Sequence, residues 1–592
     1  MNIFKDRFSE IKKASEPLYK SPKSVQETIE ILKISESGIF EVADGKYSKT
    51  YRFSDVNYAT RSEDEQESFF QRYCRCLNSF DCTFKITVNN KNKDMDVLRN
   101  EVMLKYRNDG FDKMRESYNR IIEEKILEGR QGIEQERYIT ITIERKNFEE
   151  AKAQFATIEA SMFRSFAELG SKLTPLTGNE RLKILHDYYR LGREDEFNFD
   201  IRQGRITGTD FRNEICNTRI KYHPDYFEDE GKVGRVLFIK KYPTYLSDRF
   251  FTELTFLPVH SVTSVDVVPV PKDLTMKMLQ KKYLGIESDI IKQQRTRNRN
   301  NDFSSDISYA TRQKKKDIEE IMNNVRENDE SLYYVSVTMI VMADDRDELE
   351  SICETVDSIA KGAGCAVDTC MYKQREAVNT TLPIGVRQIE TMRTMLTQSL
   401  AVLMPFNVQE LCDRNGIYYG VNQISKNIIV GNRKKLLNGN GFIFGVSGAG
   451  KSFQAKMEMG SVLLSTDDNV IAVDPMNEYE DVTEKYNGTY INISTNTRNY
   501  INPMDMDVWN LDVLDSKGWV RDKCQFMLSI CEKIMKEITP QQRSIISRCV
   551  KDLYMDIARS REKYVPTMED LYNRLLEQED KEARDVALGL EI

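Results

Sequence analysis

The sequence lacks the features that mark exported, metal-binding or membrane-embedded proteins. No run of apolar residues among its 592 approaches the ~18 that a membrane span needs. Its three histidines, His186, His223 and His260, lie far apart, and none of its eleven cysteines forms a C-x-x-C pair. This pattern argues against a zinc site or a disulfide framework. We therefore expect reduced cysteines and a cytoplasmic protein with no transmembrane segment of its own.

A strong excess of one charge is also missing. The 86 basic and 94 acidic residues leave a net charge of −8, which predicts no polyanion-binding surface over the chain as a whole. Only 14 residues are proline and 28 glycine, while 40% are hydrophobic and 30% charged. Such a composition is typical of folded, helix-rich chains, and the length favours several domains.

The most polar stretch, residues 290–322, allows two interpretations. It is either a basic arm that contacts DNA or a solvated helical hairpin whose tip lies near "RNRNNDFSSD". Its aromatic residues, Phe303 and Tyr309, are too few for a base-stacking platform. We favour the hairpin.

Strand and helix patterns alternate through the first two thirds of the chain. "TFKITVNN" (83–90) and "ERYITITIE" (136–144) have a period of two, and Asn147 with Glu150 predicts the start of a helix. The same succession of strand, acidic turn and helix recurs at 333–364, where Asp345 is the expected cap. We predict open α+β sandwiches here. A duplicated module is one hypothesis, although strand–helix units are common.

We predict three regions and a mixed α/β and α+β fold. Residues 1–200 form an N-terminal α+β domain, and residues 201–405 a second α+β region with a polar helical hairpin near 271–326. Residues 406–592 form part of a P-loop domain with a helical insertion near 519–580. A capping box from Thr539 to Gln542 starts one of the expected helices.

A glycine-rich motif at residues 445–452 predicts nucleotide binding. "GVSGAGKS" fits the pattern G-x-x-x-x-G-K-[ST], whose glycines turn the loop and aim main-chain N–H groups at phosphates. Lys451 is expected to reach the β- and γ-phosphates of ATP, and the Ser452 hydroxyl to ligate Mg²⁺. The predicted ATP-binding residues are Gly445, Val446, Ser447, Gly448, Ala449, Gly450, Lys451 and Ser452.

The flanking sequence predicts a βαβ unit. "FIF" (442–444) is expected to be a short buried strand that enters the loop, and "NVIAV" (469–473) a second buried strand of a parallel sheet. The helix between them should have one apolar face that packs against the rest of the domain. Its expected members are Phe453, Met457, Gly460 and Leu464.

Hydrolysis also needs carboxylates that hold Mg²⁺ and activate water. By spacing, Asp474 at the end of the second expected strand is a candidate for the metal-side residue, with Glu478 close behind it. The alternative is a supporting role at the tip of that strand. Together with Lys451, these are the predicted catalytic residues. No later segment is an apolar strand that ends in Asp-Glu, so we expect the P-loop domain to be incomplete at its C-terminal end.

The assembled motifs resemble the large conjugative-transfer ATPases of type IV secretion systems, the VirB-type members of the FtsK/HerA-like motor superfamily. The resemblance is carried mainly by "TTLPIG" (380–385), "GIYYGVNQISKNIIVGNR" (416–433), the P-loop, "VIAVDPMNEYEDVTEKYNGTYINI" (470–493) and "YINPMDM" (500–506). "GRVLFIKKYPTYLSDRFFTEL" (234–254) is the clearest match in the region before them.

The resemblance implies a RecA-like ATPase domain that forms a homo-hexamer on the cytoplasmic face of the plasma membrane. Its partners would be membrane channel proteins and a coupling ATPase, with DNA as a further candidate. In such proteins the Walker B strand and the inter-subunit arginine lie beyond the point that residue 592 reaches, which favours the supporting role for Asp474. Two alternatives stay open: a DNA-translocating motor unrelated to secretion, and a nucleotide-binding assembly component that does not hydrolyse ATP.

Overall fold

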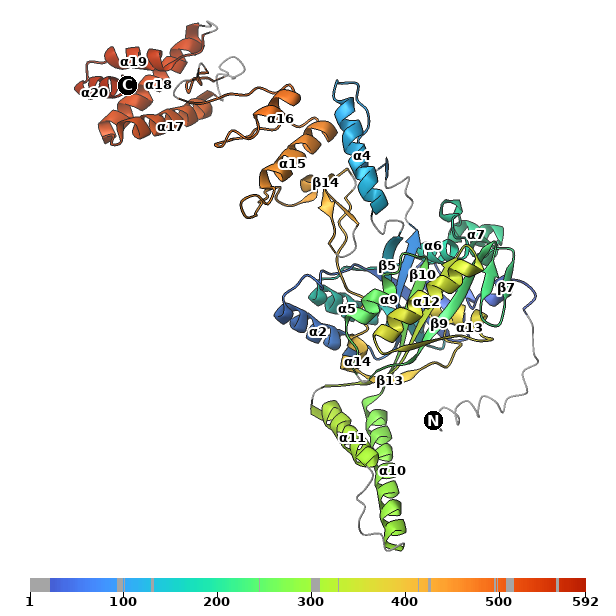
Figure 1. Cartoon of the computed structure of the whole chain (residues 1–592). Helices are drawn as coiled ribbons and strands as arrows, with labels where there is room; N and C mark the ends of the chain where they lie inside the picture. Colours follow the sequence, from blue (N-terminus) through green and yellow to red (C-terminus); the bar gives the residue numbers. More distant parts are fainter. Residues whose placement is uncertain are drawn as a thin grey trace. The chain divides into compact units, whose positions relative to one another are not determined.

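The computed structural model describes most of the chain (Figure 1). The described residues are 22–92, 99–100, 102–128, 133–243, 245–299, 309–327, 329–413, 415–423, 427–494, 497, 499–506, 516–560 and 564–591. They belong to two compact units, residues 1–471 and residues 472–592. The start of the predicted N-terminal domain and most of the predicted hairpin tip, including Phe303, lie outside the described residues.

A single large sheet is the centre of the first unit. Its described part has the order β1-β2-β3-β5-β4-β10-β11-β9-β8-β7, with β6 paired to β3, β12 to β9 and β13 to β11. The strands are β1 (Lys33–Ile34), β2 (Ile39–Ala43), β3 (Lys46–Phe53), β4 (Thr83–Asn92), β5 (Ile133–Glu144), β6 (Leu173–Pro175), β7 (Ile220–Tyr222), β8 (Phe227–Asp229), β9 (Lys232–Lys241), β10 (Ser261–Val270), β11 (Leu332–Ala343), β12 (Ala366–Thr369) and β13 (Arg393–Leu396).

The sheet contains the same arrangement twice. In the first copy the spatial order is β6-β3-β5-β4, and in the second it is β12-β9-β11-β10, with antiparallel neighbours throughout. The chain order in each copy is strand, helix, strand, strand, helix, strand. This is the ferredoxin-like βαββαβ pattern. The arrangement supports the duplication hypothesis drawn from residues 137–169 and 333–364.

The two copies join edge to edge. β4 of the first copy pairs with β10 of the second in an antiparallel ladder that runs from Phe84 opposite Val267 to Asn90 opposite Ser261. The strands of the predicted regions 1–200 and 201–405 therefore share one sheet. Because the two strands run in opposite directions, the connections that follow them leave the sheet at opposite ends.

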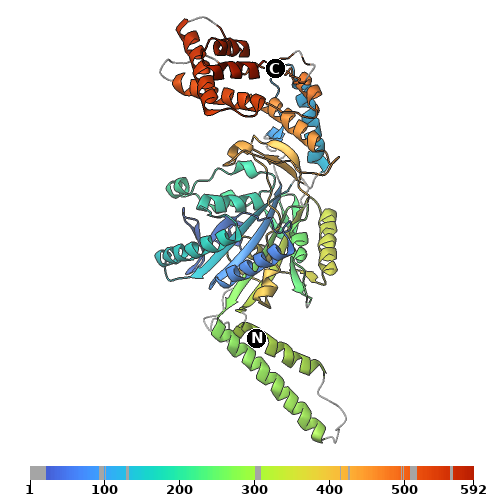
Figure 2. The same ribbon diagram turned by 90° about the vertical axis from the view of Figure 1, so that its left-hand side faces the viewer.

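Each of these connections carries a helical insertion. The first, between β4 and β5, contains α4 (Asp112–Glu128). The second, between β10 and β11, contains α10 (Lys272–Arg299) and α11 (Tyr309–Glu327), which lie side by side (Figure 2). This helical pair agrees with the hairpin that the sequence predicted near 271–326.

Helices cover one face of the sheet with apolar side chains. They are α2 (Glu63–Asn78), α5 (Phe148–Leu169), α9 (Arg249–Thr255), α12 (Arg346–Gly362) and α14 (Thr397–Ala401). The expected caps are present: Asn147 accepts a hydrogen bond from the Glu150 N–H at 2.9 Å, and Asp345 accepts one from the Glu348 N–H at 2.9 Å. Local sequence signals therefore set where α5 and α12 begin.

The opposite face is covered by α6 (Gly178–Tyr189), α7 (Ile201–Thr207), α8 (Arg212–Ile215), α13 (Gln374–Thr381) and the segment that follows α13. The motif "TTLPIG" spans the end of α13 and the start of this segment, and buried cations hold carbonyl groups along it. Lys85 donates to the carbonyls of Thr380, Leu382 and Val386. Burial lowers the pKa of Lys85 to about 8.

A second buried cation, Arg181, holds the middle of the same segment. Its guanidinium donates to the Pro383 carbonyl at 3.2 Å and the Ile384 carbonyl at 3.3 Å. It also donates to the main-chain carbonyls of Gly38 and Ser48, both at 2.9 Å. The motif is thus bound to the sheet by main-chain hydrogen bonds to charged groups, which are stronger than bonds between neutral groups.

A buried carboxyl group near the sheet edge should make stability depend on pH. Asp229 in β8 accepts a hydrogen bond from Asn217 at 2.7 Å, and burial raises its pKa to about 7. The folded state therefore holds the proton more tightly than the unfolded chain does. Its contribution to stability is complete below the ordinary pKa of about 4 and is lost as the pH rises through 7.

We expect Asp229→Asn to remove this loss. Between pH 5 and pH 8, the free energy of unfolding of the variant should rise relative to that of the unchanged protein by a few kcal/mol, since each pKa unit is worth about 1.4 kcal/mol. Urea unfolding followed by far-UV circular dichroism at several pH values measures this difference. Asp195→Asn, at an exposed position, is the control. Parallel pH profiles for Asp229→Asn and the unchanged protein would contradict the prediction.

The described part of the second unit is helical. It contains α16 (Glu480–Lys485), α17 (Ser516–Met535), α18 (Pro540–Ser560), α19 (Met568–Leu576) and α20 (Lys581–Gly589). The last four pack around a common apolar core, in agreement with the helices predicted near 519–580. The predicted capping box is formed, because the Thr539 N–H donates to Gln542 at 2.9 Å and the Gln542 N–H to Thr539 at 3.3 Å.

Nowhere in the described part of the chain does a helix combine the length and the apolar character that crossing a bilayer requires.

Candidate nucleotide-binding site

The glycine-rich loop follows a small antiparallel hairpin. The hairpin consists of β14 (Ile417–Val421) and β15 (Ile428–Gly431), and α15 (Lys451–Ser465) begins directly after the loop. The start of this helix at Lys451 agrees with the sequence prediction. Of its expected apolar face, Gly460 and Leu464 are buried, whereas Phe453 is exposed.

The two strands predicted around the loop are not formed. Residues 442–444 and 469–473 have no strand assignment, and the side chains of Phe442 and Phe444 are 83% and 87% exposed. The two rings stack on each other, with their centroids 5.7 Å apart. A parallel strand is stable when strands flank it and both of its faces are covered. Among the described residues neither segment has a neighbouring strand, so their apolar sequence alone does not make them strands.

The loop itself has the backbone that the motif requires. Gly448 and Gly450 have φ of +79° and +87°, a region that residues with a Cβ rarely adopt. The Ala449 N–H donates to the Val446 carbonyl at 3.2 Å and closes the turn. A Cβ at Gly445 would lie 3.2 Å from the Cβ of Ala449 and the Cγ of Lys451, so the close folding of the loop also favours glycine there.

The beginning of α15 is suited to an anion. Its N-cap residue is Gly450, and no side chain caps this helix end in the described structure. The first main-chain N–H groups of a helix have no partner within the helix and carry the positive end of its dipole. Phosphate groups bind at such positions when the loop lets them approach.

Lys451 lies over the loop. Its ammonium group donates to the carbonyls of Gly445 at 2.9 Å and Val446 at 3.0 Å. The positive charge of Lys451 is therefore held beside the first two residues of the loop, and the side chain is exposed. Ser452 follows as the second residue of α15, next to this charge in sequence.

Contacts that the sequence did not predict hold α15 against the hairpin. Glu458, in the middle of α15, accepts a hydrogen bond from the Tyr419 hydroxyl at 2.9 Å and pairs with Arg433 at 2.9 Å. Burial and the bond to Glu458 raise the pKa of Tyr419. Both partners belong to the motif "GIYYGVNQISKNIIVGNR", so part of this motif serves to hold the helix that carries the loop.

Asp474 and Glu478 belong to the second unit. The Asp474 carboxylate accepts hydrogen bonds from the N–H groups of Met476 at 3.3 Å and Tyr479 at 2.9 Å. It thereby closes a turn in which Asn477 has φ of +58°. Glu478 is exposed on this turn. This geometry gives Asp474 a structural role in the turn, and its part at the nucleotide site stays a prediction.

The residues of the loop fit ATP with Mg²⁺. The uncapped helix start and the Lys451 ammonium group would hold the phosphates, and the Ser452 hydroxyl would ligate the metal ion. A bound Mg²⁺ supplies positive charge that neutralises the phosphate oxygens. The described part of the chain has no cluster of three or more His, Cys, Asp or Glu side chains that could hold a metal ion.

Comparison with known proteins adds the family of this region. No curated protein matches the chain at a significant level. The family model of the TraG P-loop domain matches residues 413–586, a segment that contains the hairpin β14–β15, the loop, α15, Asp474 and most of the helical bundle. A P-loop domain indicates nucleotide binding. Residues 413–586 are thus similar to the TraG P-loop domain, which confirms the resemblance to a conjugative-transfer P-loop ATPase.

Proposed function

We propose that the chain is the ATP-binding motor subunit of a conjugative DNA-transfer apparatus of the type IV secretion class. ATP hydrolysis would power assembly of the apparatus or transfer of its substrate. One observation carries the proposal: a loop with two glycines at positive φ, a lysine over it and an uncapped helix after it lies inside a TraG P-loop domain.

The proposed site uses residues 445–452 for the phosphates. In a RecA-like arrangement, the loop would lie at the edge of a parallel sheet. Lys451 would contact the β- and γ-phosphates, and Ser452 the Mg²⁺ ion. As a motor, the protein would act as a homo-hexamer on the cytoplasmic face of the plasma membrane, beside channel proteins and a coupling ATPase. DNA is a further candidate partner.

Nucleotide binding tests the proposal directly. A fluorescent ATP analogue is titrated into the chain with Mg²⁺ and again with excess EDTA. We expect saturable binding of one nucleotide per chain that weakens about tenfold without the metal, a loss of about 1.4 kcal/mol. An absence of binding at millimolar nucleotide would overturn the proposal.

Ser452→Ala should abolish the effect of the metal while leaving metal-free binding in place. The expected reason is that alanine has no hydroxyl oxygen for Mg²⁺. Ser465→Ala is the matched control, because this serine lies at the other end of α15 and its hydroxyl donates to the Ser461 carbonyl at 2.6 Å. If Ser452→Ala keeps the full tenfold response to EDTA, the metal assignment is wrong.

One observation favours a second function, that of a nucleotide-binding assembly component without hydrolysis. Both oxygens of Asp474 accept main-chain N–H groups of its own turn, which suits a structural carboxylate better than a metal ligand. Release of phosphate from ATP separates the two functions. Turnover near ~1–100 s⁻¹, the range of kinases, supports the motor, and nucleotide binding without turnover supports the assembly component.

A further inference from the structure

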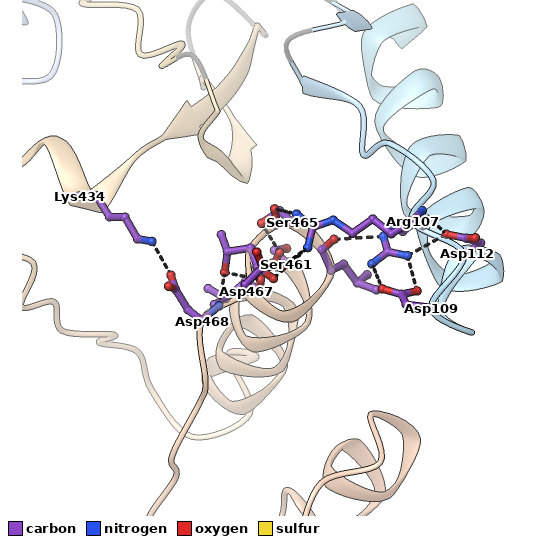
Figure 3. A network of polar contacts seen from close by, with 12 residues as sticks. Arg107, Asp109, Asp112, Lys434, Ser461, Ser465, Asp467 and Asp468 are labelled. Carbon is purple, nitrogen blue, oxygen red and sulfur yellow. Dashed lines mark hydrogen bonds and ion pairs between the residues drawn. The ribbon is translucent and has the colours of Figure 1, made fainter.

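The insertion between β4 and β5 contacts the end of α15 that is distant from the phosphate loop. Its described residues, 99–100 and 102–128, include α4 and the turn before it. Figure 3 shows this turn beside the C-terminal end of α15, with polar side chains between them. The contact joins a connection of the large sheet to the helix that carries the candidate site.

A fully buried arginine is the centre of the contact. Arg115 has a relative exposure of 0%, and its Nε donates to the Leu464 carbonyl at 3.1 Å. Its other nitrogens donate to Asp109 at 2.5 and 2.6 Å and to Asp112 at 2.7 Å. These hydrogen bonds lower the pKa of Asp109. A buried charge is tolerated when ion pairs and hydrogen bonds of this kind compensate for the lost contact with water.

Arg107 continues the same contact along the two residues that follow Leu464. It donates to the main-chain carbonyls of Ser465 at 2.7 Å and Thr466 at 3.3 Å, and to the Asp467 carboxylate at 2.7 Å. The two arginines thus bind three successive carbonyls at the end of α15. These carbonyls have no partner within the helix and form the negative end of its dipole, so cations stabilise them.

The turn is built to present these arginines. Asp112 accepts hydrogen bonds from the N–H groups of Arg107 at 3.0 Å and Asn108 at 2.9 Å, and Asp109 accepts one from the Phe111 N–H at 3.0 Å. The two carboxylates therefore shape the turn and hold Arg115 at the same time. This order reduces the entropy lost when the contact forms.

Apolar packing fixes α4 beside the same helix. Tyr118, Ile122 and Ile126 form a buried cluster with Ile428 and Val430 of β15. β14, the partner of β15, holds the middle of α15 through Tyr419 and Glu458. The insertion thus contacts both α15 and the hairpin against which α15 packs.

We propose that Arg115 is a positioning residue for the phosphate loop, and that nucleotide binding and the docking of α4 with the turn before it stabilise each other. The proposal rests on the proposed nucleotide site. α15 spans 15 residues from Lys451 to Ser465, about 22 Å as an α-helix. Arg115 fixes one end of this rigid helix, and the nucleotide binds at the other end. The Arg115 contact therefore orders the helix that the nucleotide needs, and bound nucleotide orders the helix end that Arg115 contacts. Such coupling is reciprocal.

Nucleotide affinity of the full chain gives the first test. Arg115→Gln should weaken binding of the fluorescent ATP analogue about 5- to 50-fold, within the range usual for coupled sites. Arg120→Gln is the matched control, because Arg120 lies exposed on the same helix. Arg107→Gln serves as a milder second variant, since this side chain is partly exposed and its loss leaves Asp109 and Asp112 paired with Arg115.

Hydrogen exchange of α4 gives the reciprocal test, which a purely structural role would not change. ATP should slow the exchange of residues 112–128 in the unchanged protein, and the effect should disappear in Arg115→Gln. Unaltered affinity in both arginine variants, or exchange of α4 that ignores nucleotide in a protein that binds it, would overturn the inference alone. If the unchanged protein binds no nucleotide, the proposed function fails and the coupling fails with it.

Discussion

Lys451→Ala is expected to abolish measurable nucleotide binding. The lysine is the charged group of the loop, and its ammonium already lies among the loop carbonyls, at 2.9 and 3.0 Å from those of Gly445 and Val446. Hydrogen bonds to charged groups contribute about 1.5–3 kcal/mol each. Losing such bonds to two phosphates should therefore weaken binding by more than about a hundredfold, or roughly 3 kcal/mol.

Titration of the fluorescent ATP analogue measures this loss. Lys456→Ala is the control, because Lys456 lies on the same helix and outside the motif. Thermal melting should show that both variants fold, which separates loss of the site from loss of the protein. Binding by Lys451→Ala within a few fold of the unchanged protein would show that the loop does not hold the phosphates through this charge.

Arg181→Met should cause the largest loss of stability. The side chain is 3% exposed, and it satisfies the carbonyls of Gly38, Ser48, Pro383 and Ile384 while it lies over the Phe40 ring at 3.8 Å. Burial lowers its pKa to about 9, so it is charged at neutral pH. Methionine fills much of the space and donates no hydrogen bond. The carbonyls of Ile384 and Pro383 keep hydrogen bonds from the hydroxyls of Ser48 at 2.6 Å and Thr50 at 3.2 Å. Hydrogen bonds to a charged group contribute about 1.5–3 kcal/mol each, and several are lost together, so we expect a loss of about 3 kcal/mol or more.

The choice of probe matters for this measurement. Both tryptophans of the chain, Trp509 and Trp519, lie in the second unit, so their fluorescence does not report on the sheet. Far-UV circular dichroism during urea unfolding should show an earlier transition for Arg181→Met, whereas tryptophan fluorescence should change little. Arg202→Met is the control, since the ion pair of Arg202 with Glu36 is exposed and such pairs contribute at most about 1 kcal/mol. Equal midpoints for the two variants would contradict the prediction.

Local signals in the sequence predicted the elements of the first unit well. The caps at Asn147 and Asp345 and the alternation in residues 83–90 and 136–144 depend on neighbours within a few residues, and all are present in the structure. The P-loop motif is likewise local, and α15 begins at Lys451 where the motif places it. Such features need no knowledge of the rest of the chain.

Long-range pairing was beyond the reach of these patterns. Nothing local indicates that β4 pairs with β10, where Thr87 lies opposite Ser264, 177 residues further along the chain. The alternation in 83–90 places Lys85 opposite the apolar face, and a lysine usually signals solvent. The structure buries it under the "TTLPIG" segment. Arg115 was missed for the same reason, since only tertiary contacts reveal that a helical arginine is enclosed.

The strands expected beside the loop were wrong for a different physical reason. The runs at 442–444 and 469–473 have strand composition, but a strand takes its stability from neighbours that the run itself does not contain. An apolar composition therefore favours a strand at these segments, but it does not supply the neighbouring strands that a sheet requires. The site residues Asp474 and Glu478 stay predictions, since their chemistry depends on such a sheet.

The seam between β4 and β10 has a consequence for how the first unit can be divided. Inside the sheet these two strands satisfy each other's main-chain groups, and each carries apolar side chains toward the helical layer. Severing the polypeptide between the copies and parting them would bare a long central strand on both products, with the open amides that recruit foreign chains. The two βαββαβ copies are therefore one cooperative folding unit. The smallest part of the sheet that can be transferred to another protein or produced alone is the pair of copies.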